Sequence, residues 1–76
     1  MTVKDLITSY YGEELGIKIC DSETEKWLIP HIWRTDWLLI NPTTKEYIYK
    51  SFHQYDDKEV YSWEMIKDEL FIYIEL

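Results

Sequence analysis

Cys20, His31 and His53 are the residues of this sequence that could pair a nucleophile with a base. A catalytic thiol needs a neighbouring imidazole, and in known enzyme families it lies in a recognisable local motif. Cys20 instead ends an alternating apolar run and has no such motif around it. This context favours a small buried hydrophobic residue. We therefore expect no catalytic residue and a protein that is not an enzyme.

Metal binding would depend on His53 and Asp56, which form the local pattern His53-x-x-Asp56 beside Asp57. Such loose spacing arises often by chance, and acidic turns commonly serve only as turns. The acidic loop at residues 21–25 lacks the glycine and the distal glutamate of an EF-hand calcium loop. We expect no metal and no cofactor.

The charges are distributed unevenly along the 76 residues, which carry a net charge of −7. Residues 1–25 hold six acids against two lysines, and residues 53–76 hold seven acids against two lysines. The middle segment, residues 26–52, carries four bases against two acids. Blocks of one sign indicate either solvated faces or a surface that meets a positively charged partner.

The basic middle segment also contains interleaved aromatic residues, a pattern compatible with stacking on single-stranded nucleic acid. The acidic flanks argue against this function because they would repel phosphates. The same negative charge disfavours binding to a membrane surface. We expect no direct contact with nucleic acid and none with a membrane.

Several acids stand where they oppose local stability. Glu13 and Glu14 fall at the end of the first predicted helix, against the macrodipole, and Glu64 and Asp68 are spaced as like charges on the second. Such placement is mild support for a surface retained for use. The candidate partner-binding residues are Glu13, Glu14, Asp21, Glu23, Glu25, Asp56, Asp57, Glu59, Glu64, Asp68 and Glu69.

The first half of the chain has clear local signals. Thr2 and Asp5 fit a capping box, and apolar residues follow at helical spacing, which predicts a helix over about residues 3–13. The alternation of Leu15, Ile17 and Ile19 predicts a strand. The apolar segment 27–33 contains Pro30, which predicts an edge strand or a bent strand.

The second half is harder to interpret. Residues 36–40 and 46–50 are strand-like runs around the turn 41–44 and predict a hairpin. A second turn at 56–58 precedes a helix that would begin at Ser62, with Trp63, Ile66 and Leu70 as its buried stripe. Residues 71–74 either continue this helix or form a last strand.

Together these elements predict one α+β domain. A small antiparallel sheet of three to five strands would be flanked by an N-terminal and a C-terminal helix. So short a chain needs reinforcement of its core. We expect it from the four tryptophans, Trp27, Trp33, Trp37 and Trp63.

The lone cysteine and the N-terminal residues, which lack the features of a signal peptide, predict a cytoplasmic protein. In size, acidity, aromatic content and absence of a catalytic signature, the whole chain resembles small phage and mobile-element inhibitors, such as anti-CRISPR proteins and uracil-DNA glycosylase inhibitors. No motif carries this resemblance. It implies a non-enzymatic inhibitor that acts as a DNA mimic and binds a basic nucleic-acid-binding protein, such as a CRISPR effector or a DNA-processing enzyme.

An alternative hypothesis is a small homo-oligomeric interaction or assembly module. The apolar segment from Phe71 to Ile74 would then form a homodimer interface, because exposed apolar area of this kind often marks an interface. The acids would be incidental to that function.

Overall fold

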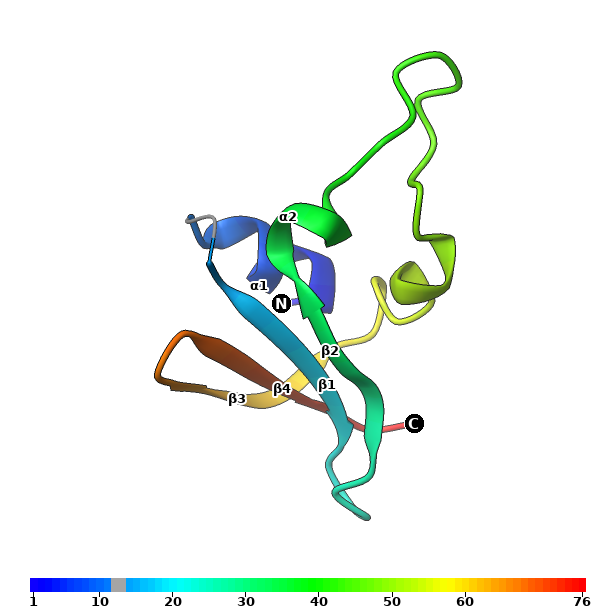
Figure 1. The fold of residues 1–76 in the computed structure, drawn as a ribbon. Helices are drawn as coiled ribbons and strands as arrows, with labels where there is room; N and C mark the ends of the chain where they lie inside the picture. The colour runs from blue at the N-terminus through cyan, green and yellow to red at the C-terminus, as the bar shows by residue number, and fades with distance from the viewer. Residues whose placement is uncertain (12–13) are drawn as a thin grey trace.

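The computed structural model describes residues 1–11 and 14–76 (Figure 1). Along the chain, its elements are α1 (Val3–Ser9), β1 (Gly16–Asp21), β2 (Trp27–Trp33), α2 (Arg34–Trp37), the 3₁₀ turn η1 (Lys50–His53), β3 (Val60–Ile66) and β4 (Glu69–Ile74). Within the described ranges, four strands form one sheet in the order β2-β1-β4-β3. The α+β class is therefore confirmed.

Helix α1 begins at the predicted capping box. The Asp5 amide donates to Thr2 Oγ1 and the Thr2 amide donates to Asp5 Oδ2, each over 3.2 Å. The helix ends at Ser9, because Tyr10 has an extended backbone. It is thus shorter than the predicted helix over about residues 3–13, of which residues 12 and 13 lie outside the described part of the chain.

Strands β1 and β2 confirm the predictions for this part of the chain. They pair antiparallel through a register that shifts twice, and Pro30 lies on β2, at the edge of the sheet. A proline at that position removes a backbone donor only from the outer side of the sheet, where no strand needs it.

The sheet is mixed, so the expectation of an antiparallel sheet is wrong for its centre. Strands β1 and β4 run parallel, with Ile17 opposite Leu70 and Ile19 opposite Ile72. Parallel neighbours require a long crossover connection, and here the chain between β1 and β4 supplies it.

The predicted C-terminal helix is also wrong. Residues from Ser62 onward form β3, which pairs antiparallel with β4 through a two-residue turn at Lys67 and Asp68. Lys67 adopts a positive φ of 56° in this turn. The apolar residues 71–74 belong to β4, an interior strand, which decides the question that the sequence left open.

The predicted hairpin at residues 36–50 exists only near its turn. Asn41 accepts backbone N–H groups of Thr43 and Thr44 through its side chain, and a single bridge joins Ile40 to Tyr47. The flanking residues are helical turns, α2 and η1, and the loop between them extends away from the sheet (Figure 1).

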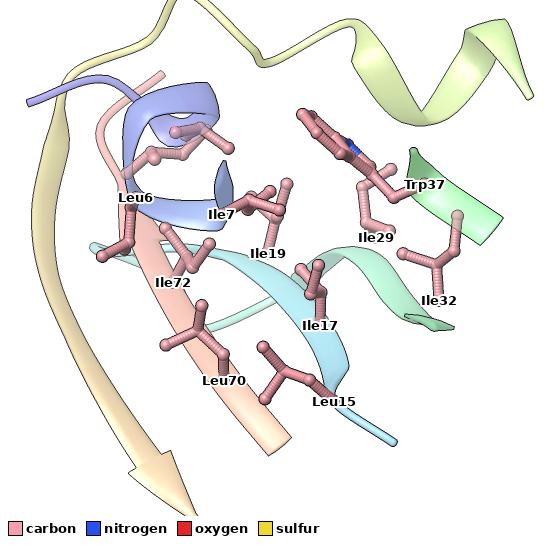
Figure 2. Packing of buried hydrophobic residues seen from close by; sticks show 12 residues of the cluster. Leu6, Ile7, Leu15, Ile17, Ile19, Ile29, Ile32, Trp37, Leu70 and Ile72 are labelled. Carbon is pink, nitrogen blue, oxygen red and sulfur yellow. The ribbon is translucent and has the colours of Figure 1, made fainter. Parts of the chain in front are cut away.

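The core lies between one face of the sheet and the helices (Figure 2). Leu6 and Ile7 of α1 pack with aliphatic residues of β1 and β4, and Trp37 of α2 closes the cluster beside Ile29 and Ile32. The expected four-tryptophan core is wrong. Trp37 is 1% exposed, whereas Trp27, Trp33 and Trp63 are 60%, 44% and 48% exposed.

Candidate binding surface

The sheet has a second face, which points away from the core. On β1 and β4 it carries the alternate residues that the core does not use, and β2 and β3 extend it on either side. We call this surface the open face and define it by Lys18, Trp27, His31, Trp33, Tyr61, Ser62, Glu64, Ile66, Glu69, Phe71 and Tyr73. Trp27, Trp33 and Ile66 are among the large apolar side chains exposed there.

Glu69 lies at the centre of a charged cluster on the open face. Its carboxylate meets Lys18 Nζ at 3.0 Å and His31 Nδ1 at 2.8 Å, one oxygen to each partner. Burial acts to raise the pKa of Glu69, but the hydrogen bonds from Lys18 and His31 outweigh it and lower the pKa. The cluster therefore holds an ionised carboxylate between two basic groups.

Gly16 makes this cluster possible. A Cβ atom at Gly16 would lie 2.8 Å from His31 Cε1 and 3.0 Å from Glu69 Oε2. The imidazole therefore lies directly over the glycine, which explains a glycine inside a strand. Its ring meets Trp33 edge-on at a centroid distance of 5.0 Å.

Aromatic rings flank Lys18, the second basic residue of the cluster. Lys18 Nζ lies 4.2 Å from the ring centroid of Trp27 and 5.0 Å from that of Phe71. Such contacts fix a cation while leaving the outer surface of the rings exposed. One shallow pocket adjoins this region, lined by Glu14, Gly16, His31, Trp33, Ile66, Lys67, Asp68, Glu69 and Phe71.

A second shallow pocket lies at the other end of the open face, and we call it the Tyr61 pocket. Its lining residues are Ser22, Glu25, Tyr61, Ser62, Glu64 and Tyr73. The Tyr73 hydroxyl donates to Glu64 Oε1 over 2.9 Å. This hydrogen bond, together with burial and the negative charges of Glu64 and Glu25, raises the pKa of Tyr73 to about 12. Two carboxylates and two phenol rings thus converge on one pocket.

The predicted acidic residues do not form one surface. Glu14, Glu25, Glu64, Asp68 and Glu69 line the two pockets of the open face. Glu13 lies outside the described residues. Glu23 and Asp57 are exposed in turns away from the strands.

The remaining predicted acids serve local structure. Asp21 accepts the Glu23 amide and the Thr24 hydroxyl and so holds the β1–β2 turn. Glu59 binds the N-terminal ammonium at 3.0 Å. Asp56 Oδ2 lies 2.7 Å from His53 Nδ1, within hydrogen-bonding distance. These three acids therefore lie in local contacts outside the two pockets of the open face.

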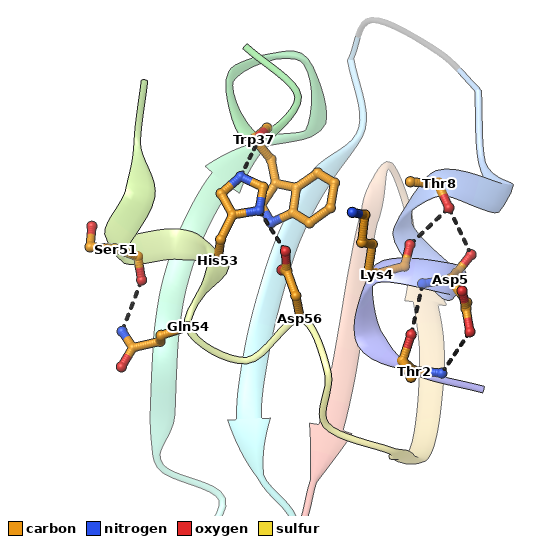
Figure 3. Close-up of polar contacts among 9 residues, drawn as sticks. All are labelled: Thr2, Lys4, Asp5, Thr8, Trp37, Ser51, His53, Gln54 and Asp56. Atoms are coloured by element: carbon orange, nitrogen blue, oxygen red, sulfur yellow. Dashed lines mark hydrogen bonds and ion pairs between the residues drawn. The ribbon is translucent and has the colours of Figure 1, made fainter. Parts of the chain in front are cut away.

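The predicted pair of His53 and Asp56 is real, but it braces the core (Figure 3). His53 Nε2 donates to the Trp37 carbonyl oxygen over 2.8 Å, so both ring nitrogens are engaged. The imidazole also stacks on Tyr47 at 3.5 Å and packs against Trp37 at 4.3 Å. In the described part of the chain, no three His, Cys, Asp or Glu side chains are grouped as metal ligands.

Cys20 is 2% exposed, which confirms its interpretation as a small buried residue. Burial raises the pKa of its thiol, with a smaller opposing effect of Lys18. No local pattern in the sequence pointed to Lys18, Tyr61 or Tyr73 as site residues, and the sequence indicated His31 only as a possible catalytic base. The available signal was Gly16, a glycine at an outward position of an alternating strand, which indicates a close approach.

The comparisons with known proteins supply no relative. No protein-family model, no curated protein sequence and no solved structure matches the chain. Among the described residues, no helix is both long and apolar enough to cross a bilayer. The function must therefore be argued from the surface itself.

Proposed function

We propose that this protein is a non-enzymatic inhibitor that binds a positively charged nucleic-acid-binding protein and blocks its access to DNA or RNA. The observation that carries the proposal is the Tyr61 pocket. Glu25 and Glu64 lie there beside Tyr61 and Tyr73, and within residues 1–11 and 14–76 neither carboxylate forms an ion pair. The partner would be a CRISPR effector or another DNA-processing enzyme.

The chemistry of the pocket suits arginine and lysine. A guanidinium can bind a carboxylate through two hydrogen bonds and stack on an aromatic ring at the same time. Proteins that bind nucleic acid present these cations to its phosphates. In a DNA duplex the phosphates supply one negative charge per about 1.7 Å of helix axis. Carboxylates beside aromatic rings can compete for such a surface, with a net charge of −7 to steer the encounter.

Binding would centre on the Tyr61 pocket, because its two carboxylates form no ion pair within the described residues, whereas Glu69 at the other end of the open face does. There Lys18 and His31 surround the carboxylate of Glu69. That end offers exposed rings instead, among them Trp33. Aromatic residues of this kind commonly form the energetic centre of protein interfaces. We place the site of action in the cytoplasm of a bacterial host cell.

The alternative of a homo-oligomeric module keeps some support from the exposed apolar side chains of the open face. The homodimer interface would, however, differ from the segment Phe71–Ile74 that the sequence suggested. Ile72 and Ile74 are fully buried in the core, so the segment Phe71–Ile74 can present only Phe71 and Tyr73 to a second copy. Trp27, Trp33 and Ile66 would have to supply most of the contact.

The test is capture of a partner from nuclease-treated lysate of a bacterial host by three forms of the protein. The first is wild type, and the second carries Glu25→Lys and Glu64→Lys in the Tyr61 pocket. The third carries Thr43→Lys, Glu46→Lys and Gln54→Lys, which change the net charge equally on exposed residues outside this pocket. We expect wild type and the third form to capture the same protein and the second form to lose it.

The captured protein must then be tested for inhibition. Its complex with a labelled DNA or RNA, observed by gel mobility shift, should dissociate when wild type is added and persist with Glu25→Lys/Glu64→Lys. Capture of the partner by wild type should weaken as salt rises, because exposed charge contacts are screened. Equal capture by all three forms would contradict the role of the pocket. A captured protein whose nucleic acid binding is unaffected would contradict the proposed inhibition.

A further inference from the structure

Strand β3 is the least protected edge of the sheet. Its residues from Tyr61 to Ile66 are all exposed, and the strand contains no proline. The opposite edge, β2, is protected by Pro30 and by two register shifts. Unpaired strand edges are templates for another extended chain, so the contrast between the two edges is informative.

The hydrogen bonds around β4 show which backbone groups of β3 are free. The carbonyls of Asp68 and Ile74 accept N–H groups from the β1 side, from Gly16 and Ser22. Residues alternate along a strand, so Glu69, Phe71 and Tyr73 direct their backbone groups toward β3. Their partners are Ile66, Glu64 and Ser62.

It follows that the backbone N–H and C=O groups of Trp63 and Met65 point away from the sheet. In the described part of the chain, no backbone group bonds to them from that side. The start of the same edge is already covered by this chain itself. Val60 donates to the Met1 carbonyl over 3.0 Å, and Thr2 bridges antiparallel to Glu59. The chain's own N-terminal residues thus pair with this edge as far as Val60. Beyond Val60 the edge has no paired segment within the described residues.

The side chains near the open part of the edge favour a basic segment. An added strand would direct alternate side chains to the two faces of the sheet. On the core side, Met65 borders a shallow pocket lined also by Tyr10, Leu15, Tyr11, Lys67 and the two acids Glu14 and Asp68. An arginine or lysine could lay its apolar stem on the first two and place its charged head by the two acids.

The open face offers the same chemistry on the other side of the edge. Glu64 lies there in the middle of β3, beside Tyr61. A second copy of this chain fits the edge less well, because each copy carries −7 and would bring its own Glu64 to the pairing. Charge complementarity therefore selects a basic partner.

We infer that β3 binds an extended, basic segment of a partner protein as a fifth strand, through the backbone groups of Trp63 and Met65. This inference rests on the proposed function, because it takes the partner to be a basic protein. It adds the mode of recognition: main-chain pairing at an edge, with cationic side chains on both faces of the sheet.

The direct test uses the full chain and a synthetic peptide, acetyl-Lys-Lys-Val-Val-Lys-Lys-amide, whose lysines fall on both faces when it is extended. The control peptide has the same side chains but carries N-methyl groups on alternate backbone nitrogens, which removes donors and keeps the charge. We expect saturable binding of the first peptide, slower hydrogen exchange at the amides of Trp63 and Met65, and about tenfold weaker binding of the methylated peptide.

Two results would overturn the inference. Equal binding of both peptides, without protection of Trp63 and Met65, would show charge attraction alone. Protection of these amides without any peptide, increasing with protein concentration and accompanied by a dimer in sedimentation, would show that a second copy occupies the edge.

A variant separates this inference from the proposed function. Met65→Pro removes one outward N–H, and circular dichroism checks that it folds. Capture of the cellular partner by Met65→Pro and wild type alike would refute the edge mode and leave the function standing. Failure of wild type to capture or inhibit any nucleic-acid-binding protein would refute the function, whatever the peptides show.

Discussion

The two faces of strands β1 and β4 have opposite characters although they share the same backbone. The inner face consists of aliphatic side chains that are at most 1% exposed, including Ile17, Ile19, Leu70 and Ile72. The open face carries Lys18 and Glu69 as an ion pair among half-buried aromatic rings. Burial of aliphatic area supplies most of the stability of a small domain. The open face is thereby left available to mix charge and aromatic surface for recognition.

The largest loss of stability should come from a substitution of a buried residue on the inner face. Ile72→Ala removes a fully buried side chain at the centre of the sheet and should cost about 2–5 kcal/mol of unfolding free energy. Its neighbour Phe71 points to the open face, so Phe71→Ala should cost clearly less. Chemical denaturation followed by circular dichroism measures both. Equal costs would show that the open face belongs to the core.

The charged cluster of the open face should give a smaller, pH-dependent effect. Folding lowers the pKa of Glu69 below its usual 4.5, so the unfolded chain takes up its proton more readily. The stabilisation is therefore complete well above pH 4.5 and is lost as pH falls through the folded pKa. Glu69→Gln should be less stable than wild type at neutral pH, by about 1 kcal/mol or less for a partly exposed ion pair.

The difference between wild type and Glu69→Gln should shrink on acidification, because the wild-type carboxyl then becomes neutral as well. Glu75→Gln, at an exposed carboxyl beyond β4, is the control and should show no such convergence. Denaturation curves at several pH values between neutral and acidic measure this. A constant difference would show that the cluster is not coupled to folding.

Gly16→Ala should change the free energy of unfolding even less, and it tests the close contact between His31 and the backbone of β1. The new Cβ would collide with the His31 ring, whose side chain can turn away, so the contact with Glu69 should be lost. A gain of about 0.5–1 kcal/mol from replacing a strand glycine opposes this loss, so the net change should be small. The ring resonances of His31 should shift in NMR spectra. An unshifted ring in a folded variant would contradict the close approach.

The smallest effect is expected at the Tyr61 pocket. Tyr73→Phe removes one exposed hydrogen bond to Glu64 and should cost less than about 1 kcal/mol at neutral pH. Because folding raises the pKa of Tyr73 from 10 to about 12, its stabilisation is lost as pH rises through this range. Wild type should therefore lose more stability than Tyr73→Phe on alkalinisation. Parallel curves for the two proteins would argue that this hydrogen bond is absent in solution.

Local signals predicted the first half of the fold well. The capping box at Thr2, the alternation through Ile17 and Ile19, and the proline in β2 each act through neighbouring residues, and each is confirmed. The prediction for the residues of β3 was wrong because nearly every side chain of this edge strand is exposed. Its sequence therefore shows no alternation of apolar and polar residues. Trp63, Ile66 and Leu70 then matched a helical spacing by chance. The turn signal was also missing, since Lys67 takes the positive φ where a glycine is usual.

The binding surface was predicted only in part for a different reason. Acidity and aromatic content are visible in the sequence, but their convergence depends on pairings between distant strands. Glu25 and Tyr61 meet because the β1–β2 turn and the start of β3 lie at the same end of the sheet. His31 and Glu69 are 38 residues apart and meet across Gly16. No local pattern encodes either approach.

The parallel pairing of β1 with β4 also bears on the order of events during folding and synthesis. The central pair joins residues 16–21 to residues 69–74, so a nascent chain ending before residue 69 has no partner for the inner edge of β1. Until β4 is available, the isoleucines of β1 lack the β4 side chains against which they pack. Pairing β1 with β4 also closes a long loop, which slows folding. This small domain should therefore complete its sheet only after β4 has left the ribosome.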